Sequence, residues 1–313
     1  MNLSRRVTIR QLEVFAAAAR AENFSRVSEA LHLTQPAVSM QIRQLEDVVG
    51  MALFNKVGRR KVLTEAGAML LRYASRVLGE LQDAEQALQA LQGLAGGTIT
   101  VGLVSTAKYF APRLLAMFSR DHPGVEVRFM VGNRQTLVQL LKDNQTDLAV
   151  MGRPPGEVDT VCEPLADNPN VLVGPAGHRL ARTRRFDIQE LRHEPFLQRE
   201  TGSGTRLMME ELFRVHLFKP ARIVTLDSNE TIKQAVIAGL GISVLSLHTL
   251  SLELRSGELA VLRADGLPVQ RTWNVVHASR RQLSPAAQAF RRFLIEQTRP
   301  YLKTAYAKLL RGR

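Results

Sequence analysis

The stretch from Phe24 to Leu45 constrains the fold of this chain more than any other, because it predicts two short helices joined by a tight turn. The hydroxyl of Thr34 can cap the second helix, and Pro36 falls in its first turn, where the missing N–H is tolerated. Gly50 is a natural end for this helix. Apolar residues recur at helical spacing in between and predict a buried stripe made of Val38, Ile42, Leu45 and Val49.

A polar stripe accompanies the apolar one on the second helix. It consists of Gln35, Ser39 and Arg43, spaced four residues apart. Side chains of these types can reach base edges and phosphates in a major groove, where a helix-turn-helix places the N-terminal part of its second helix. We therefore predict that this helix contacts DNA and that the remainder of the chain controls when it does so.

Two helices are predicted before this DNA-contacting helix, and the second of them is the first helix of the pair described above. Residues 8–21 predict a first helix, with an apolar face made of Ile9, Leu12, Phe15, Ala16 and Ala19. Asn23 or Ser25 can cap the short helix that follows. The inward side chains of that helix are expected to be Val27, Ala30 and Leu31, and His32 with Leu33 would make the turn.

Four cations lie within six residues shortly after the helix pair, namely Lys56, Arg59, Arg60 and Lys61. The run from Leu53 to Thr64 predicts a two-stranded wing with Gly58 in its turn. Such cations would lie against the phosphate backbone and add affinity without sequence information. The alternative is a solvated charged loop.

The formal net charge of +13 favours a polyanionic partner. Residues 1–64 hold ten Lys/Arg against five Asp/Glu, whereas residues 280–313 hold nine against the single Glu296. Much of the positive charge therefore belongs to the C-terminal tail, and the total is no proof of a DNA-binding head. Residues 301–313 are amphipathic and basic, and they are expected beyond the last helix, either against another subunit or DNA or as a disordered tail.

A long helix is predicted from Glu65 to Gln92, because this stretch contains no proline. Its apolar residues step alternately by four and three, which is a heptad seam made of Leu70, Ala74, Val77, Leu81, Ala84, Leu88 and Leu91. Packing against a second copy is the natural use of such a seam. The alternative is a helix that lies on its own domain. The glycines at 93, 96 and 97 predict a hinge and a domain boundary.

Strands and helices alternate after this boundary. Strands are predicted at 98–104, 126–131, 147–151, 171–174, 223–226, 242–247 and 273–277, and helices at 108–120, 135–143, 205–215, 229–238 and 285–297. This α/β pattern favours a mostly parallel sheet covered on both faces. Two polar passages, 152–164 and 264–271, would be crossovers that divide the region into lobe 1 (about 98–160 and 270–298) and lobe 2 (about 161–268).

Hydroxyl and basic residues at predicted strand ends and helix starts suggest an anion site between the lobes. The run from Glu200 to Arg206 offers glycines for close backbone approach, hydroxyls and one cation, although a plain capped helix start explains it equally well. The candidates are Ser105, Thr106, Arg153, Thr201, Gly202, Ser203, Gly204, Thr205 and Arg206.

Several classes of protein are disfavoured. The single cysteine, Cys162, excludes an intramolecular disulfide and makes a Cys-based zinc site improbable. The chain has no catalytic motif such as G-x-S-x-G, no metal-ligand spacing, no apolar run near the ~20 residues of a membrane span and no signal peptide at its N-terminus. We therefore expect a cytoplasmic protein that is not an enzyme and has no cofactor or metal. The main alternative is a ligand-binding protein or an enzyme built on the two-lobed region.

The stretches RQLEVF, ALHLTQPAVSMQIRQLE and LFNKVGRRKVLTEAG resemble the LysR-type transcriptional regulators. The resemblance implies an all-α winged helix-turn-helix head (1–64), a linker and dimerisation helix (65–95) and a two-lobed α/β effector domain like the periplasmic binding proteins (96–313). It implies dimerisation through Leu70, Val77, Leu81, Leu88 and Leu91. It also implies DNA contacts from Ser25, Thr34, Gln35, Pro36, Ser39, Met40, Arg43, Lys56, Arg59 and Arg60.

Stretches of the effector region, including MGRPP, ETGSGTR and SNETIKQAVIAGLGISVLS, look most like the regulators of Calvin-cycle operons (CbbR-like regulators). This resemblance implies a homodimer or homotetramer that activates carbon-fixation operons and contacts double-stranded DNA and RNA polymerase, but no membrane. The implied small-molecule effector is an anionic metabolite such as a phosphorylated sugar, phosphoenolpyruvate or NADPH. Met40 and Lys56 replace arginines common in the family. A regulator of another pathway, such as amino-acid synthesis or aromatic degradation, is the nearer alternative.

Two substitutions separate base recognition from phosphate attraction. Gln35→Ala should weaken binding to a specific site by ~1–3 kcal/mol through a lost base contact, whereas Arg59→Ala should weaken binding to all DNA alike and reduce its salt dependence. Titration of each variant against specific and random duplexes over a range of salt concentrations measures both effects. Unchanged discrimination by Gln35→Ala would show that the helix face is wrongly assigned.

Overall fold

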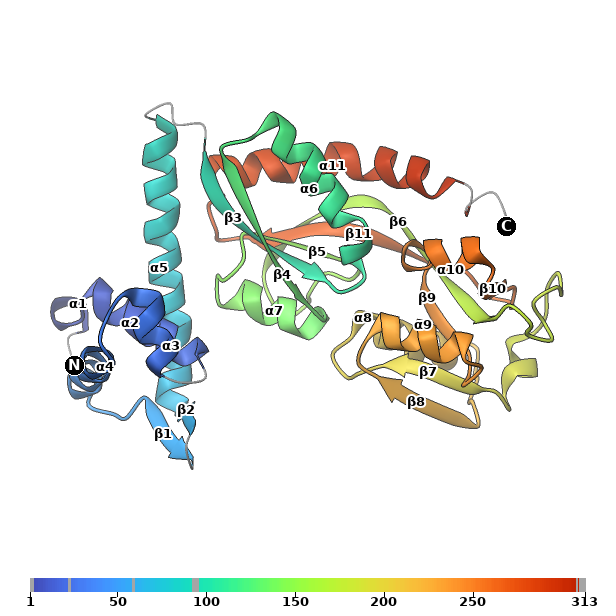
Figure 1. The fold of residues 1–313 in the computed structure, drawn as a ribbon, viewed down its shortest axis with the longest axis horizontal. Helices are drawn as coiled ribbons and strands as arrows, with labels where there is room; N and C mark the ends of the chain where they lie inside the picture. Colours follow the sequence, from blue (N-terminus) through green and yellow to red (C-terminus); the bar gives the residue numbers. More distant parts are fainter. Residues whose placement is uncertain (1–2, 22–23, 58–59, 92–95, 308, 310–313) are drawn as a thin grey trace. The chain divides into compact units, whose positions relative to one another are not determined.

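The computed structural model describes the chain except residues 1–2, 22–23, 58–59, 92–95, 308 and 310–313 (Figure 1). The backbone alone is described at 4, 24, 57, 60, 83, 86–87 and 89–91. The chain forms two compact units, one made of Met1–Gln92 with Lys142–Gln145 and the other of Gly93–Leu141 with Thr146–Arg313.

The first unit is a helical head with a hairpin and one long helix (Figure 1). Its elements are α1 (Leu3–Arg6), α2 (Ile9–Arg20), α3 (Phe24–Leu31), α4 (Gln35–Val49), β1 (Phe54–Val57), β2 (Arg60–Leu63) and α5 (Glu65–Leu91). Thr8 and Gln11 form a capping box at the start of α2. Thr34 caps α4 by accepting from the Ala37 N–H at 3.3 Å, and Gly50 ends it at a φ of 74°. The four predicted core residues of α4 are buried, so the helix-turn-helix prediction is confirmed.

Three details of the head differ from the predictions. Ile9 is 43% exposed and Ala30 is exposed, because the buried face of α2 is centred on Val14, Phe15 and Ala18 and that of α3 on Val27. Ser25 lies inside α3, which begins at Phe24, so it does not cap that helix. Asn23, the other predicted cap, lies outside the described residues.

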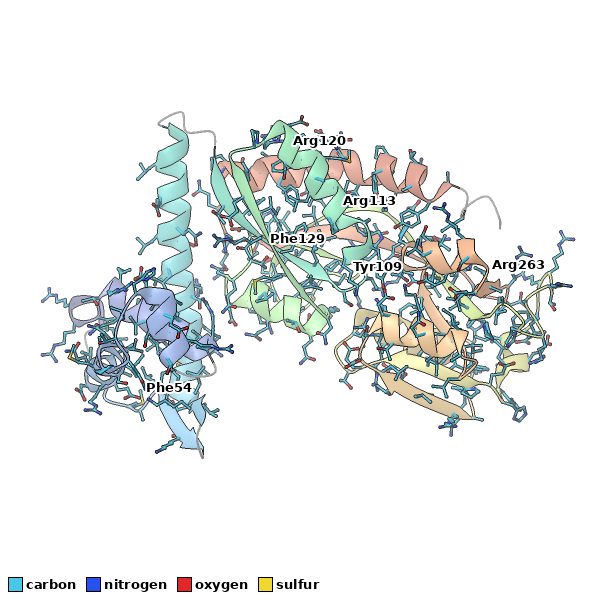
Figure 2. All side chains as sticks on the ribbon, in the orientation of Figure 1. Phe54, Tyr109, Arg113, Arg120, Phe129 and Arg263 are labelled. Carbon is cyan, nitrogen blue, oxygen red and sulfur yellow. The ribbon has the colours of Figure 1, made fainter. Side chains whose placement is uncertain are left out.

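The predicted wing is confirmed. β1 and β2 pair antiparallel from Phe54 opposite Leu63 to Val57 opposite Arg60. The ring of Phe54 meets the buried ring of Phe15 edge to face, with centroids 5.7 Å apart, and so ties the wing to the helices (Figure 2). Gly58 and Arg59, which were predicted in and beside the turn, lie outside the described residues.

Helix α5 is divided in its packing. Ala74 is buried in the core of the head and Leu70 packs against the same core, so this part of the predicted seam belongs to the head itself. Further along, Val77, Leu81 and Leu88 are 43%, 48% and 61% exposed. The alternative prediction, that α5 packs on its own domain, therefore holds for the first turns of the helix, which contain Leu70 and Ala74. Leu91 ends α5, and its side chain lies outside the described residues.

The second unit is an α/β structure with two lobes. Its elements are β3 (Gly97–Val104), η1 (Ala107–Tyr109), α6 (Ala111–Asp121), β4 (Val125–Gly132), α7 (Arg134–Lys142), β5 (Leu148–Met151), β6 (Thr160–Pro175), η2 (Ile188–Leu191), β7 (Pro195–Arg199), α8 (Gly204–Val215), β8 (Arg222–Leu226), α9 (Asn229–Ile237), β9 (Ser243–Ser246), η3 (Leu247–Thr249), α10 (Ser251–Ser256), β10 (Leu259–Leu262), β11 (Val269–Ala278) and α11 (Pro285–Ala305).

The prediction of a mostly parallel sheet is wrong for the principal sheet. Among the described residues this sheet has the order β10-β6-β11-β5-β3-β4, with β9 also paired to β6. Strand β3 runs parallel to β4 and β5, but every pairing of β6 and β11 is antiparallel. The physical reason is that the two predicted crossovers lead into long strands, which run back along each other and connect the lobes. The short strands β7 and β10 were not predicted, and β7 pairs with β8 in parallel.

Helices cover both faces of the sheet in lobe 1, as predicted. Strand β5 is buried along its whole length. Its Leu148 and Val150 pack in the cluster that contains α6 and α11. Its Ala149 and Met151 alternate to the opposite face, where they meet Leu137 and other side chains of α7.

The C-terminal tail is more ordered than predicted. Helix α11 continues past Pro300 to Ala305, and Leu302 and Tyr306 are 3% and 5% exposed. Tyr306 meets the ring of buried His248 edge to face at 4.7 Å between centroids. Burial of these two side chains outweighs the cost of about 3 kcal/mol for a proline inside a helix. The expectation that residues from 301 onward lie beyond the last helix is therefore wrong for residues 301–305.

The packing of α11 predicts that Leu302→Ala lowers the free energy of unfolding by about 2–5 kcal/mol, because it removes a buried side chain and leaves a cavity. The neighbouring Lys303 is exposed, so Lys303→Ala should change it by less than about 0.5 kcal/mol. Urea unfolding of the full chain, followed by tryptophan fluorescence from Trp273, measures both. Equal stability of the two variants would contradict the assigned packing.

Candidate functional site

The outward face of α4 gathers the predicted base-contacting side chains. Gln35, Pro36, Met40 and Arg43 are exposed, Ser39 is half-buried, and Thr34 is exposed where it caps the helix. Ser25 is exposed on α3. The first three turns of α4 therefore present amide, hydroxyl and guanidinium donors on a rigid element that its buried stripe fixes to the head.

Cations of the wing lie near those of α4. Lys56 and Lys61 are opposite each other in the hairpin and both are exposed. The pKa of Lys61 is lowered, first by partial burial, and the positive charges of Arg43 and Lys56 add to the effect although Glu46 opposes it. Such a concentration of positive charge is what a phosphate backbone would relieve. Arg60 lies on β2 with its side chain undescribed, and Arg59 lies outside the described residues.

A polar cavity of about 30 Å³ lies between the lobes of the second unit. Lobe 1 contributes the ends of β3 and β5 and the start of α7, and lobe 2 contributes Arg199 and the start of α8. The long strands β6 and β11 provide its remaining walls. The lining residues are Val104, Ser105, Thr106, Asn133, Arg134, Met151, Gly152, Arg153, Asn168, Asn170, Arg199, Ser203, Gly204, Thr205, Ser246, Arg271 and Trp273.

Four guanidinium groups line this cavity, namely those of Arg134, Arg153, Arg199 and Arg271. The pKa of Arg271 is lowered, chiefly by burial and further by the positive charges of Arg153 and Arg134. Arg271 donates to the carbonyl of Gly204 at 2.9 Å, and Arg134 forms an ion pair of 3.0 Å with Glu157. The Nε of Arg134 is buried without a hydrogen-bond partner among the described residues. Glu157 pairs with Arg134 and Glu200 with Arg199, so Arg153 and Arg271 add further positive charge, and an anion would stabilise this environment.

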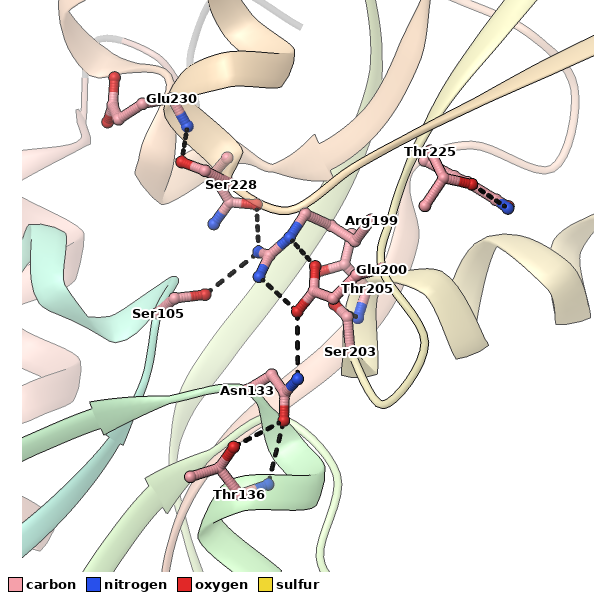
Figure 3. A network of polar contacts seen from close by, with 12 residues as sticks. Ser105, Asn133, Thr136, Arg199, Glu200, Ser203, Thr205, Thr225, Ser228 and Glu230 are labelled. Atoms are coloured by element: carbon pink, nitrogen blue, oxygen red, sulfur yellow. Dashed lines mark hydrogen bonds and ion pairs between the residues drawn. The ribbon is translucent and has the colours of Figure 1, made fainter. Parts of the chain in front are cut away.

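Arg199 organises the wall of this cavity that joins the lobes (Figure 3). Its guanidinium is 3% exposed and donates twice to Glu200, at 2.7 and 3.0 Å. It also donates to Ser105 of lobe 1 at 3.1 Å and to Asn229 of lobe 2 at 2.8 Å. Asn133 of lobe 1 donates to Glu200 at 3.1 Å. Burial acts to raise the pKa of Glu200, but the hydrogen bonds from Arg199 and Asn133 more than offset it and hold the pKa below its usual range.

The structure brings together six of the nine predicted effector residues, namely Ser105, Thr106, Arg153, Ser203, Gly204 and Thr205. The other three do not line the cavity. Thr201 is exposed, and Arg206 pairs with Glu210 at 2.7 Å along α8. Gly202 has a φ of 87°, and a Cβ there would lie 2.5 Å from the Gln135 side chain, so it serves the close approach of this loop to α7.

The sequence predictions missed the side chains that carry most of the charge, which are Arg134, Arg199 and Arg271. Two signals were available. Asn133 and Arg134 directly follow β4, at the same kind of strand end as Ser105. Asn168 and Asn170 are buried two positions apart on β6, so both point to one face of the strand, just before its apolar run Val171–Val173.

Nothing in the described part of the chain indicates a metal centre or a membrane segment. No three His, Cys, Asp or Glu side chains there are placed to hold a metal ion. None of the described helices combines the length and the apolar character that crossing a bilayer requires. Buried His248 accepts from Trp273 Nε1 at 3.1 Å, which is a structural role.

Two family descriptions match this architecture. Residues 9–68 match the "Bacterial regulatory helix-turn-helix protein, lysR family", and residues 92–299 match the "LysR substrate binding domain". The chain belongs to the LysR family of bacterial transcriptional regulators. It is therefore a DNA-binding regulator of transcription and not an enzyme, as predicted.

Its relatives cover almost the whole chain. It is 57% identical over 309 residues to the "HTH-type transcriptional regulator CfxR" of Cupriavidus necator, with 99% of this chain and 98% of the relative aligned. It is 44% identical over 291 residues to the "RuBisCO operon transcriptional regulator" of Allochromatium vinosum, with 93% and 96% aligned. The predicted resemblance to CbbR-like regulators is confirmed, since CbbR of Rhodospirillum rubrum is 47% identical over 286 residues, with 91% and 95% aligned.

Solved structures agree with both units. The regulatory domain of Synechocystis CcmR in complex with 2-PG is 40% identical, covers 64% of this chain and 97% of its own, and has a TM-score of 0.62. Full-length CbnR complexed with its target DNA has a TM-score of 0.66 over 92% of this chain and 99% of its own. At 21% identity, CbnR supports the fold alone.

The Arg199–Glu200 pair predicts a pH-dependent stability. Glu200→Gln leaves the buried Arg199 without its countercharge and should lower the free energy of unfolding by about 2–4 kcal/mol at pH 7. Because the folded-state pKa of Glu200 is lowered, its stabilising contribution is complete above the unfolded pKa of about 4.3 and is lost as the pH falls through the folded value. The difference between the wild type and Glu200→Gln should therefore shrink below about pH 4.

Denaturant unfolding at several pH values measures this difference. Glu211→Gln is the matched control, because Glu211 is exposed and forms its ion pair with Arg214, which is exposed as well. A Glu200→Gln variant as stable as Glu211→Gln at pH 7 would show that the network contributes no stability.

Proposed function

We propose that this regulator controls carbon-fixation operons and that a phosphorylated or otherwise anionic metabolite binds its interlobe cavity. The observation that carries the proposal is the convergence of Arg134, Arg153 and Arg271 beside the N-terminus of α8. Guanidinium groups and free helix N–H groups are the donors that phosphates and carboxylates use in proteins. The names of the relatives, among them two RuBisCO operon transcriptional regulators, support the choice of pathway.

Each candidate group has a role in this proposal. The arginines bind the charged part of the effector, and the hydroxyls of Ser105, Ser203 and Thr205 orient it. The cavity shares Gly152, Arg153 and Arg271 with a groove of about 730 Å³, which offers room for the remainder of a larger metabolite. That the CcmR regulatory domain was solved in complex with 2-PG supports a small-molecule effector for the corresponding domain of this chain.

We propose further that the chain acts in the cytoplasm as a homodimer or a homotetramer. Residues 1–64 would bind DNA, residues 65–95 would dimerise through Val77, Leu81 and Leu88, and residues 96–313 would bind the effector. Two heads would then contact two half-sites about one helical turn apart, where RNA polymerase is engaged. The effector can switch the regulator only if it binds one arrangement of the lobes better than the other.

Effector binding provides the test. Wild-type protein, Arg271→Gln and Arg214→Gln are titrated calorimetrically with 2-phosphoglycolate, ribulose bisphosphate, phosphoenolpyruvate, NADPH and two aromatic acids. At least one of the phosphorylated compounds should bind the wild type, and Arg271→Gln should weaken its binding tenfold or more through the lost charged hydrogen bond. Arg214, which is exposed and outside the cavity, should be dispensable.

Two results would contradict the proposal. Binding confined to the aromatic acids would reject the carbon-fixation assignment and favour a regulator of aromatic degradation. Equal affinity of wild type and Arg271→Gln for a bound phosphorylated compound would show that the cavity is not its site.

A further inference from the structure

The outward face of α4 carries one large apolar side chain in its middle, Met40. This side chain is 52% exposed. Pro36 lies one turn before it and Arg43 one turn after it, and both are exposed. At 3.6 residues per turn these three positions lie opposite the buried stripe, so Met40 points more directly away from the head than Gln35 or Ser39 does.

Packing within the head does not account for Met40. The side chain belongs neither to the buried core of the head nor to the partly buried residues packed against it. Solitary exposed apolar side chains are common on protein surfaces and require no explanation by themselves. Met40 differs because it lies in the middle of the outward face of α4, which is proposed to contact DNA, one turn before the exposed cation Arg43.

The major groove offers one apolar group to such a side chain. Every base edge exposes hydrogen-bond donors or acceptors there, but only thymine adds a methyl group, at C5. The sulfur of methionine is only a weak hydrogen-bond acceptor and gains little from the polar groups, whereas its flexible and polarisable thioether can pack on a methyl group whose exact position varies. An exposed methionine flanked by polar side chains therefore matches a thymine flanked by bases recognised through hydrogen bonds.

We propose that Met40 is a specificity-determining residue that packs on the 5-methyl group of one thymine in each half-site. The inference rests on the proposed function, because it requires α4 in the major groove. It goes further by assigning a base and an atom to a side chain that forms no hydrogen bond with it. Burial of one methyl group corresponds to about a fourfold gain in affinity for each half-site.

The test replaces single atoms of DNA. Full-length protein first selects its preferred duplex from a random library, so that no target gene has to be assumed. Each thymine in the selected half-sites is then replaced by deoxyuridine, which removes only the 5-methyl group. Each half-site should contain one thymine whose replacement weakens binding by the wild type about fourfold. The same single replacement should leave the affinity of Met40→Ala unchanged.

Two further variants serve as controls. Met40→Leu keeps an apolar side chain of similar size and should retain the sensitivity to deoxyuridine. Met51→Ala should retain it too, because Met51 is 53% exposed, as Met40 is, but follows the end of α4. Since Met40 is not part of the core, circular dichroism should show all three variants folded.

The outcomes are distinguishable. An equal response of wild type and Met40→Ala to every deoxyuridine would overturn the assignment of Met40, because the methyl groups would then act through DNA shape. The proposed regulator function and the selected duplex would not be affected by this result. The absence of any deoxyuridine effect in the wild type would overturn it as well. Failure to select any preferred duplex would overturn the proposed function together with the inference.

Discussion

The antiparallel pairing of β6 with β11 is the interaction on which the second unit depends. The two strands are paired from Thr160 opposite Ala278 to Asn170 opposite Val269. Strand β11 also pairs with β5 of lobe 1, and β6 continues into pairs with β9 and β10 of lobe 2. The lobes are therefore parts of one hydrogen-bonded sheet, and a change in their arrangement has to bend or twist this ribbon. Its register shifts between Trp273 and Asn274, beside the cavity, which is where a bulge gives a ribbon local freedom.

Polar contacts outside this ribbon also set the relation of the lobes. On the cavity side, Arg199 and Glu200 bind Ser105 and Asn133. Outside the cavity lining, the hydroxyl of Tyr109 in lobe 1 donates to Glu230 of lobe 2, and burial followed by this hydrogen bond raises the pKa of Tyr109 (Figure 2). The side chain of Arg199 has little access to water, so the loss of its partners would be costly. An effector that competes for Arg199 or Ser105 would therefore alter the balance between these contacts.

The parts of this fold that the sequence predicts are those set by short-range chemistry. Thr34 and Gly50 mark the ends of α4 through local hydrogen bonds and one left-handed residue, and the hairpin after it follows from its own pattern. Burial over long sequence separations was not predictable in the same way. Arg199 is buried because Ser105, 94 positions earlier, and Asn229 complete its hydrogen bonds. The last helix was predicted to end at residue 297 but continues to Ala305, because the tertiary packing of Tyr306 stabilises the additional turns.

The division of α5 has a mechanical consequence. Its first turns are fixed in the core of the head by Ala74 and Leu70, whereas the later seam residues Val77, Leu81 and Leu88 are exposed. Helix α5 is about 40 Å long and runs without a break from the core of the head to the seam residues proposed to contact a second copy. The head and this helix are therefore expected to move together. In such a dimer the crossing angle of the two α5 helices would set the distance between the two heads and hence between the DNA segments that they contact. A rotation of 10° between two helices of this length displaces their far ends by roughly 7 Å, about two base-pair steps.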